Sequence, residues 1–378
     1  MQADHVARSL LALPLVLGAC SSSDPEPPAG PAEQRPEPAA QATGDAPAAG
    51  AQAVDPGPSL AAAAAWLAAR QDGEGMWHDD REGVNDVGVS ALALLALMHA
   101  SPDGVGGEHA GTVRAGARAL IGWQDPQTGL IGDKVGHAFL YGHGIATLLL
   151  CELYAKSGDP ELERPARLAV NQVLRARNPY AAWRYSVPPT GENDTSVTGW
   201  MMQALLAARE AGLETDDQAF QGGLAWIDEV TDPATGRVGY DSLGSLSSRI
   251  PRVNDHLPAE MGEAMTAIGL HARTDLGADP EGAPILVKHA ELIRRKLPEP
   301  WDGGAADLYY WYQGTCAMKA MGGAWWDAWR RALTSTLVEM QVAAGDDAGS
   351  WDPVDPWSAL GGRVYTTALA TLALAECR

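Results

Sequence analysis

A unit of two helices recurs six times between Ser59 and Arg378, and this repetition constrains the fold more than any single motif. Each unit combines an amphipathic helix, a loop rich in Gly and aromatic residues, and a helix that is apolar nearly all round. The clearest copy spans residues 66–77 (WLAARQDGEGMW). It recurs at 337–351 and, more weakly, at 120–131. Degenerate copies follow Leu174, Trp226 and Ile293.

The two helices of each unit differ in amphipathicity. Residues 89–97 and 367–374 have no polar stripe, which predicts second helices surrounded by protein. Residues 285–295 instead place Ile and Leu on one face and Lys, Glu and Arg on the other, which is typical of a helix with one side in water. We expect the six inner helices to start near Val87, Ile145, Val197, Ala259, Tyr309 and Val364.

Six outer helices that alternate with six inner ones predict an all-α fold, a two-layer (α/α)6 toroid over residues 58–378. An open superhelical solenoid is the competing arrangement. The helical part has about 320 residues, above the usual size of a single core, but a ring of stacked units can exceed that limit. We therefore predict one domain.

The pattern Trp66-Leu67-x3-Gln71-x3-Gly75-x-Trp77 resembles the Gln-Trp motif of squalene and oxidosqualene cyclases. These terpene cyclases share their repeats with the β subunits of protein prenyltransferases. The resemblance covers residues 59–378 and implies a toroid of helix pairs. It is specific for the fold and much less so for the activity, because function depends on the site that a fold carries.

The N-terminal region predicts export. Residues 10–17 form an apolar segment too short to span a bilayer, as in the signal peptide expected over 1–19. The sequence Leu17-Gly18-Ala19-Cys20 resembles the lipobox of bacterial lipoproteins, which implies lipidation at Cys20; an ordinary signal peptide is the alternative. Residues 20–57, rich in Pro and Ala, predict a disordered tether. We expect a lipid-anchored protein of the bacterial envelope, on its periplasmic or surface face.

Charge excludes one class of partner. The chain has a formal net charge of −21, and residues 20–57 hold six acids and one Arg, which leaves −21 + 5 = −16 on the toroid because the charges of 1–19 cancel. Such an acidic surface has no basic stripe for a phosphate backbone. We therefore expect no nucleic acid partner.

Three expected inner-helix starts share an Asn-Asp pair, at residues 85–86, 193–194 and 254–255. Class II terpene cyclases carry Asp-x-Asp-Asp at a comparable position, and their middle Asp protonates the isoprenoid. In 191–194 that pattern places Gly191 at the first Asp and Asn193 at the acid, and an amide has no proton to give to an alkene. The resemblance therefore does not extend to the usual acid. Asp86, Asp194 and Asp255 alternatively cap their helices.

Several residues remain candidates for catalysis. Asp194 and Asp255 are possible acids, and His256 and Glu260 stand close enough in sequence to Asp255 to perturb it, as does Glu263. His143 lies between two glycines at the start of an inner helix, where it is either a base or a satisfied structural residue.

The aromatic composition is biased, with 13 Trp and 9 Tyr against 2 Phe. We expect Tyr309, Tyr310, Tyr312, Tyr365 and Asp86 to line a ligand site. The aromatic rings either hold an isoprenoid, stack on sugars or brace the loops between repeats. Consecutive aromatic residues on a helix cannot all face one way, so the run that starts at Tyr309 must divide its side chains.

The sequence indicates no metal or other cofactor. The zinc site of prenyltransferases needs an Asp-x-Cys pair, which is absent from the chain. Cys151 and Cys316 lie outside the Gly-Cys-Gly-Glu-Gln signature of thioester proteins, and no disulfide is expected between them or with Cys377.

Two classes of function follow. The first is a cyclase-like toroid that binds an apolar, isoprenoid-like ligand or an envelope partner without the usual acid chemistry. The second is an enzyme, either an atypical terpene cyclase or mutase with Asp194 or Asp255 as acid, or a glycan-active enzyme. A glycan-active enzyme needs facing carboxylates or a His and Tyr set, which Asp194, Asp255, Glu260, His143 and Tyr310 can supply.

Overall fold

A computed structural model describes residues 54–78, 83–179, 181–301 and 306–378, and it confirms the predicted all-α toroid. The described residues form twelve α-helices and no β-strand. The expected signal peptide, Cys20 and residues 20–53 of the tether lie outside the described residues. The first helix begins at Gly57.

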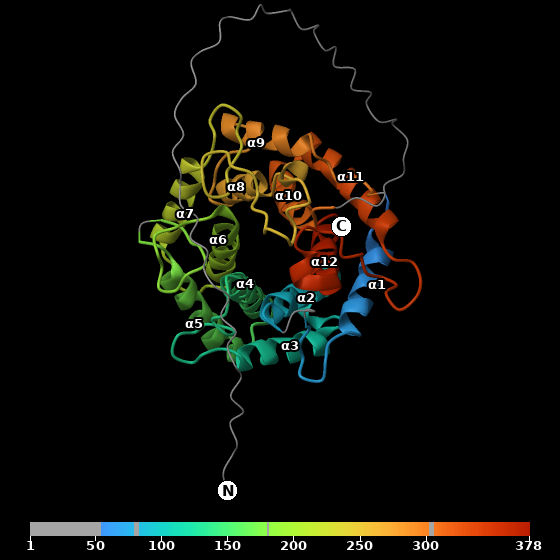
Figure 1. Cartoon of the computed structure of the whole chain (residues 1–378). Helices are drawn as coiled ribbons and strands as arrows, with labels where there is room; N and C mark the ends of the chain where they lie inside the picture. The colour runs from blue at the N-terminus through green and yellow to red at the C-terminus, as the bar shows by residue number, and fades with distance from the viewer. Residues whose placement is uncertain (1–53, 79–82, 180, 302–305) are drawn as a thin grey trace, which may run out of the picture. The chain divides into compact units, whose positions relative to one another are not determined.

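The helices form two concentric layers (Figure 1). The outer layer contains α1 (Gly57–Ala68), α3 (Ala110–Gly122), α5 (Pro160–Ala176), α7 (Asp217–Glu229), α9 (Pro284–Arg294) and α11 (Gly323–Met340). The inner layer contains α2 (Asp86–Ala100), α4 (Phe139–Ser157), α6 (Thr195–Glu210), α8 (Ala264–Asp275), α10 (Leu308–Met321) and α12 (Ser358–Ala375). Short 3-10 turns lie at Gly104–Gly106 and Ala259–Met261.

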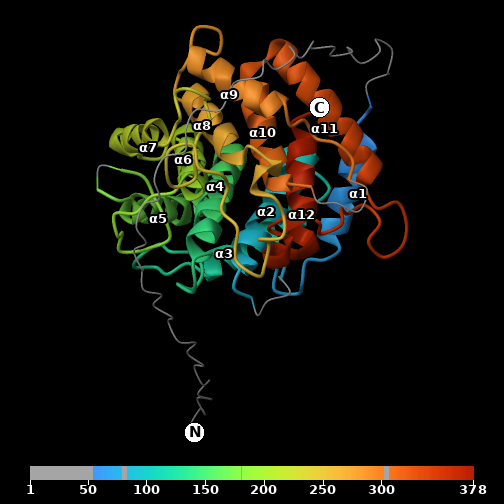
Figure 2. The same ribbon diagram turned by 45° about the horizontal axis from the view of Figure 1, so that its top comes forward.

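The ring is closed. Each inner helix packs against the next, and α12 packs against α2 as tightly as α2 packs against α4. Figure 2 shows α2, α4 and α12 side by side. Closure excludes the open solenoid, because a solenoid would leave α2 and α12 without a common interface.

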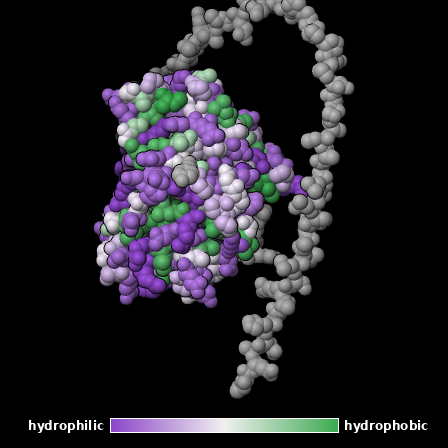
Figure 3. Space-filling model, turned by 90° about the vertical axis from the view of Figure 1, so that its left-hand side faces the viewer, coloured by the Kyte–Doolittle hydropathy of each residue, from purple (hydrophilic) through white to green (hydrophobic). Residues whose placement is uncertain are grey.

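The outer and inner helices bury different fractions of their surface, as their sequences predict. In α5, Leu162 and Val170 are buried whereas Glu163 and Arg167 are exposed. In α2, nearly every residue after Val89 is buried. The outer face in Figure 3 is accordingly mostly hydrophilic with scattered apolar side chains.

The Gln of the repeat explains how one outer helix holds the next. Gln71 Nε2 donates to Gly75 O in its own loop and to Thr112 O in the first turn of α3, both at 3.0 Å. Gln124 makes the corresponding bonds to Gly129 O and to Pro165 O of α5. The amide therefore ties each loop to the neighbouring outer helix.

The last repeat closes the ring with the same contact. Gln341 Nε2 donates to Gly349 O at 2.8 Å and to Ser59 O of α1 at 2.9 Å, across 282 residues of sequence. Gly349 has φ +93°, and a Cβ there would lie 2.5 Å from Ala62 O. Glycine is therefore required both by the backbone conformation and by the close approach of α1.

The loop after each outer helix is also tied to the following inner helix. The Trp77 N–H donates to Ser90 Oγ at 2.9 Å, and the indole Nε1 donates to Leu67 O at 2.9 Å. Three further loops repeat the first bond, with these donor and acceptor pairs: Trp183 N to Thr198 Oγ1, Val238 N to Thr266 Oγ1, and Trp351 N to Thr367 Oγ1. The Trp residues of the repeat thus brace loops.

Two predicted inner-helix starts differ from the structure. Helix α4 begins six residues before Ile145, because Gly142 does not break it: a Cβ at Gly142 would lie 3.2 Å from Gly88 N, so the glycine lets α4 approach α2 closely. Helix α8 begins at Ala264 rather than near Ala259, which lies in a 3-10 turn. Helix α12 is interrupted at Gly362 (φ 64°), and its long regular part starts near the predicted Val364.

Candidate functional site

The N-terminal ends of the inner helices gather several buried polar side chains, and Asp194 is the most constrained of them. Asp194 is fully buried and caps α6, with Oδ1 accepting a hydrogen bond from Val197 N–H at 2.8 Å. Burial raises the pKa of its carboxyl to about 6, while the bond from Val197 and a hydrogen bond with Tyr185 oppose that rise. Asp194 is therefore both a cap and a carboxyl that can carry a proton near neutral pH.

Two tyrosines connect Asp194 to the rim of the toroid. Tyr240 donates its hydroxyl to Asp194 Oδ2 at 3.5 Å and is hydrogen bonded to the Tyr185 hydroxyl. Tyr185 is half-buried and stacks on the exposed ring of His137, with centroids 4.7 Å apart. The half-buried Arg184 lies over the Tyr185 ring. A chain of hydroxyl groups thus leads from the buried carboxyl toward solvent.

A second aromatic group crosses the hollow of the ring. Tyr309 of α10 shares a hydrogen bond of 2.8 Å with Ser196 Oγ of α6. Trp200 of α6 stacks on Tyr309 and on Tyr312, with ring centroids 6.3 and 5.8 Å apart. Since α6 and α10 are separated in the ring by α8, these side chains fill the middle of the hollow.

Two more buried carboxyl groups lie at the N-terminus of α10. Asp307 caps the helix by accepting from Tyr310 N–H at 2.9 Å. Asp355, from the loop before α12, accepts from Leu308 N–H at 2.5 Å and from Trp357 N–H at 2.7 Å. Burial and the neighbouring Asp307 charge raise the pKa of Asp355, and burial raises that of Asp307. Close buried carboxyls cannot both ionise easily, so the pair retains a proton.

These groups form one electrostatic unit, which we call the tyrosine–carboxyl layer. Burial is the main cause that raises the pKa of each of its tyrosines, and the charges of neighbouring members of the layer contribute. The members of the layer are Tyr141, Tyr185, Tyr240, Tyr309, Tyr365, Asp194, Asp307 and Asp355. Several perturbed titratable groups in one place are typical of a functional site.

His143 has a structural position. It is fully buried, its Nδ1 accepts from Ile131 N–H at 3.2 Å, and its Nε2 lies 3.2 Å from Ala169 O. It thus occupies the place that Ser90 and three threonines take in the other repeats. Burial lowers the pKa of His143 to about 4, so the ring is neutral. Both nitrogens contact backbone, which leaves neither for proton transfer.

The Asp residues of the Asn-Asp pairs do not share one role in the structure. Asp194 caps its helix, but Asp255 is exposed in a turn nine residues before α8, and His256 and Glu260 are exposed in the same loop. The structure does not bring these three side chains to Asp194. Within the third pair Asn254 is the buried residue, and its Nδ2 donates to Pro356 O at 2.8 Å.

The remaining sequence candidates are dispersed. Asp86 is buried at the start of α2, with Oδ2 2.5 Å from His78 Nδ1. Glu263 is buried in ion pairs with Arg237 and Lys296. The Tyr310 hydroxyl contacts backbone carbonyls at the C-terminal end of the outer helix α9, away from the hollow. Tyr309 and Tyr312 face the hollow. The aromatic run therefore divides its side chains, as predicted.

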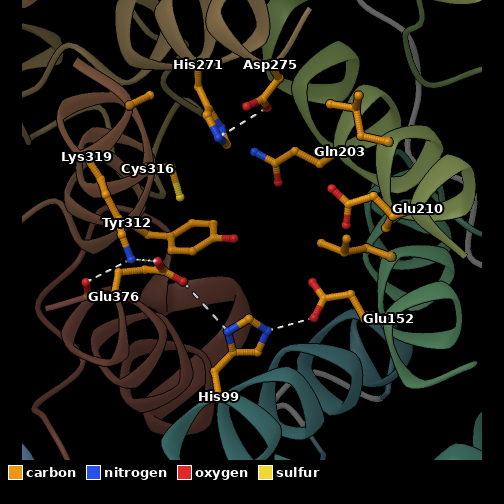
Figure 4. A pocket seen from close by; sticks show the side chains of 14 residues that line it. His99, Glu152, Gln203, Glu210, His271, Asp275, Tyr312, Cys316, Lys319 and Glu376 are labelled. Carbon is orange, nitrogen blue, oxygen red and sulfur yellow. Dashed lines mark hydrogen bonds and ion pairs between the residues drawn. The ribbon is translucent and has the colours of Figure 1, made fainter. Parts of the chain in front are cut away.

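The opposite end of the hollow opens into a cavity of about 500 Å³. Five inner helices (α2, α4, α6, α8 and α10) line it, mostly through their C-terminal halves, and Glu376, directly after α12, completes the lining (Figure 4). Its polar lining comprises His99, Glu152, Gln203, Glu210, His271, Asp275, Tyr312, Cys316, Lys319 and Glu376. Trp200 stacks on Tyr309, a member of the tyrosine–carboxyl layer, and on Tyr312, which lines the cavity, so the Trp200 ring stands between the layer and the cavity.

Ion pairs cluster on one side of this cavity. His99 lies 2.8 Å from Glu152 and 3.7 Å from Glu376, and Lys319 lies 2.7 Å from Glu376. Burial disfavours the charged imidazole, but the bonds to Glu152 and Glu376 prevail and raise the pKa of His99 to about 9. The hydrogen bond from His99 is the main cause that lowers the pKa of Glu376 to about 2.

The described residues contain no group of three or more His, Cys, Asp and Glu side chains arranged to hold a metal ion. Within the same ranges, no helix combines the length and the apolar character needed to cross a membrane.

Sequence reasoning missed most of the layer and, apart from Tyr312, the cavity lining. Tyr185 and Tyr240 each stand two residues after a loop residue that bonds an inner-helix Thr, so alignment of the repeat loops would have placed them together. The cavity residues were visible as isolated charges, such as His99 and Glu152, in the last turns of otherwise apolar helices. Their proximity across the ring has no signal in the sequence.

The similarity of this chain to known proteins lies in its fold. The chain matches no protein-family model and no curated protein by sequence. Solved structures match over most of its length, at low identity. The chain shares the (α/α)6 toroid fold.

Two kinds of protein are among these structural neighbours. One is an inactive variant of an α-1,6-mannanase from Salegentibacter sp. HEL1_6, bound to α-1,6-mannotetrose. Its TM-score is 0.58 at 14% identity, covering 85% of this chain and 100% of that one. Another is a type II terpene cyclase from Scytonema bound to geranylgeranyl dihydroxybenzoate. Its TM-score is 0.56 at 15% identity, covering 85% and 97%.

A family 76 glycoside hydrolase from Bacteroides thetaiotaomicron also shares the fold. Its TM-score is 0.60 at 11% identity, covering 86% of this chain and 78% of that chain. The toroid fold is thus common to this chain, to terpene cyclases and to glycoside hydrolases. Fold alone does not separate these chemistries.

Proposed function

We propose that the toroid is a glycan-active enzyme that uses Asp194 as its general acid. The observation that carries this proposal is the pKa of the Asp194 carboxyl, raised by burial to about 6 within a layer of tyrosine hydroxyls. General acids work best when their pKa is near the working pH. The variant of the Salegentibacter mannanase is inactive with two consecutive aspartates replaced by alanine, which is consistent with aspartate chemistry on this fold.

The proposed reaction is hydrolysis of a glycosidic bond. Asp194 gives its proton to the leaving glycosidic oxygen through the Tyr240 hydroxyl, which takes up the Asp194 proton as it releases its own. Water attacks the anomeric carbon as the C–O bond breaks. The proton lost by that water passes to the Asp307 and Asp355 pair, on the α10 side of the layer. A carboxyl on each side of the substrate is the usual arrangement for this chemistry.

A hydroxylated substrate fits this environment better than an isoprenoid. Tyrosine hydroxyls and the Arg184 guanidinium offer hydrogen bonds at the rim, and Trp200 with Tyr309 and Tyr312 fills the space that a long apolar chain would need. The cavity beyond combines apolar side chains with several charged ones. An atypical terpene cyclase that uses the same Asp194 is the second candidate. Because the raised pKa keeps the proton on the Asp194 carboxyl up to about pH 6, that proton is available to an alkene as well.

The test is release of reducing ends from a panel of glycans that includes α-1,6-mannan, measured from pH 4 to 8. The active form carries a proton on Asp194 and one ionised carboxylate in the Asp307 and Asp355 pair. The rate should therefore fall as pH rises through about 6, and fall again at the acid end of the range as the pair becomes fully protonated. Tyr185→Phe removes a hydrogen bond that lowers the pKa of Asp194, so the fall in rate near pH 6 should occur at a higher pH in this variant. Tyr154→Phe, which removes a hydroxyl outside the layer, should not change the pH at which the rate falls. A rate that increases above pH 6 would contradict the assignment.

We also propose that the toroid is anchored in the bacterial envelope through a lipid on Cys20. The lipobox-like sequence and the composition of the tether support this proposal. Cys20→Ser should move the full-length protein from the membrane fraction to the soluble fraction of the cell of origin, and mass spectrometry should find an acylated N-terminal Cys20 only in the wild type. An unmodified wild-type protein with an intact signal segment would contradict lipidation.

A further inference from the structure

The cavity at the C-terminal ends of the inner helices has an electrostatic asymmetry that the proposed chemistry of Asp194 does not use. On one side of the cavity Glu152 and Glu376 contact three cations: His99, Lys319 and Lys156, which lies just outside the lining. On the other side, α6 and α8 present Glu210, Gln203 and Asp275 (Figure 4). The lining therefore holds four carboxyl groups against two cationic side chains, with His99 protonated because its pKa is raised to about 9.

The second histidine of the lining does not change this balance. His271 Nε2 lies 3.2 Å from Asp275 Oδ2, one turn along α8. Burial lowers the pKa of His271, which outweighs the attraction of Asp275, so the ring is neutral near pH 7. Burial also raises the pKa of the Asp275 carboxyl. The α6 and α8 side of the cavity therefore presents Asp275 and the exposed Glu210 without a compensating cation from this pair.

Two amide side chains at this cavity have buried atoms without partners. Gln203 Nε2 donates to Gln313 Oε1 at 3.2 Å, but Gln203 Oε1 and Gln313 Nε2 have no hydrogen-bond partner. Gln313 is fully buried and meets Gln203, a lining residue, across the hollow. Exchanging the oxygen and nitrogen of both amides leaves one acceptor and one donor unpaired as before. Unpaired buried polar atoms are costly, and a bound molecule with a donor group would relieve the acceptor.

An aromatic surface completes the floor. Tyr312 lines the cavity, and one face of its ring is covered by Trp200 in a stack with 15° between the planes. In Figure 4 the Tyr312 side chain reaches into the space between Gln203, Glu210 and Glu152. Ammonium groups are attracted to aromatic faces as well as to carboxylates.

We propose that this cavity is a binding site for a small organic cation that carries a primary ammonium group. Glu210 and Asp275 supply the charge, Gln203 Oε1 accepts a hydrogen bond from the ammonium group, and Tyr312 forms the floor. A volume of about 500 Å³ accommodates a diamine or an amino sugar. The site is separate from Asp194, so it does not depend on the glycosidase proposal.

The test is isothermal titration calorimetry with 1,4-diaminobutane and glucosamine, each paired with its uncharged counterpart, 1,4-butanediol or glucose. We expect saturable binding of one or both amines and none of the counterparts. Glu210→Gln keeps the size of an exposed side chain and should weaken binding by about tenfold or more. Glu214→Gln removes the same charge from an exposed residue outside the cavity lining and should leave the affinity unchanged.

Each outcome decides the proposal. The proposal is wrong if neither amine binds the wild type, or if an amine and its uncharged counterpart bind equally. It is also wrong if the Glu210 and Glu214 variants lose the same affinity for the amine. The Asp194→Asn variant should bind the amine with wild-type affinity. Loss of glycan hydrolysis with retained amine binding therefore separates the two sites experimentally.

Discussion

Replacing Gly349 by alanine should destabilise the toroid by about 2 to 5 kcal/mol. Two terms contribute. The backbone at Gly349 has φ +93°, a region that disfavours a Cβ, and the Cβ would meet the Ala62 carbonyl oxygen of α1 at 2.5 Å. Because that oxygen belongs to the helix backbone, it cannot move away as a flexible side chain would. The clash lies where the last repeat closes onto the first.

The same loop offers a matched control for this prediction. Gly345 also has a positive φ, +86°, but a Cβ there would have no atom within 4 Å. Gly345→Ala should therefore lower the free energy of unfolding only by the effect of the positive φ, about 1 to 2 kcal/mol. Urea denaturation of both variants measures the difference, which reports the contact between the loop and α1. Equal destabilisation by the two substitutions would show that the close approach carries no cost.

Replacing Asp194 by asparagine should lower the rate of glycan hydrolysis by about 10²- to 10⁴-fold, the usual contribution of a general acid. Asparagine retains an oxygen that accepts from Val197 N–H, so the α6 cap survives. It has no proton to give at any pH. Asp159→Asn, at the exposed cap of the outer helix α5, makes the same chemical change without touching the layer and should leave the rate unaltered.

The folding stability of the wild type and the Asp194→Asn variant should also differ in its pH dependence. An unfolded Asp ionises near its ordinary pKa of 3.8, whereas the folded Asp194 keeps its proton until about 6. The stability that this group contributes is therefore present below pH 3.8 and is lost as pH rises through 6. The loss amounts to about 3 kcal/mol. Asp194→Asn should lack this component. Identical stability profiles, or full activity of the variant, would contradict the role given to Asp194.

The architecture separates the two proposed sites by a layer of packed rings. The tyrosine–carboxyl layer lies at the N-terminal ends of the inner helices, where free N–H groups favour Asp194 and Asp307 as caps. The charged cavity lies at the opposite ends. The Trp200 ring stands between them, stacked on Tyr309 of the layer and on Tyr312 of the cavity. One ring thus offers two chemically different ends.

The sequence by itself determined the repeat, the two classes of helix and an all-α arrangement of helix pairs, because these depend on local periodicity; the contact between α12 and α2 decided that the pairs close into a ring. In three repeats Gln71, Gln124 and Gln341 contact the next outer helix in the same way, so the motif that predicts the repeat also marks a recurring contact. Asp194 was also found, because an Asp before an apolar run is a local signal.

Only the tertiary structure decided which polar groups share a site. The sequence left His143 as either a base or a structural residue. Its contact with Ile131 shows that it takes the place of a repeat Ser or Thr. Asp255 has the same local sequence as Asp194, yet it lies exposed in a long loop. Tyr240 reaches Asp194, and Asp355 reaches the start of α10, because the ring places loops from different repeats side by side. Burial then sets their protonation, and neither distance across a ring nor burial at its centre is encoded in local sequence.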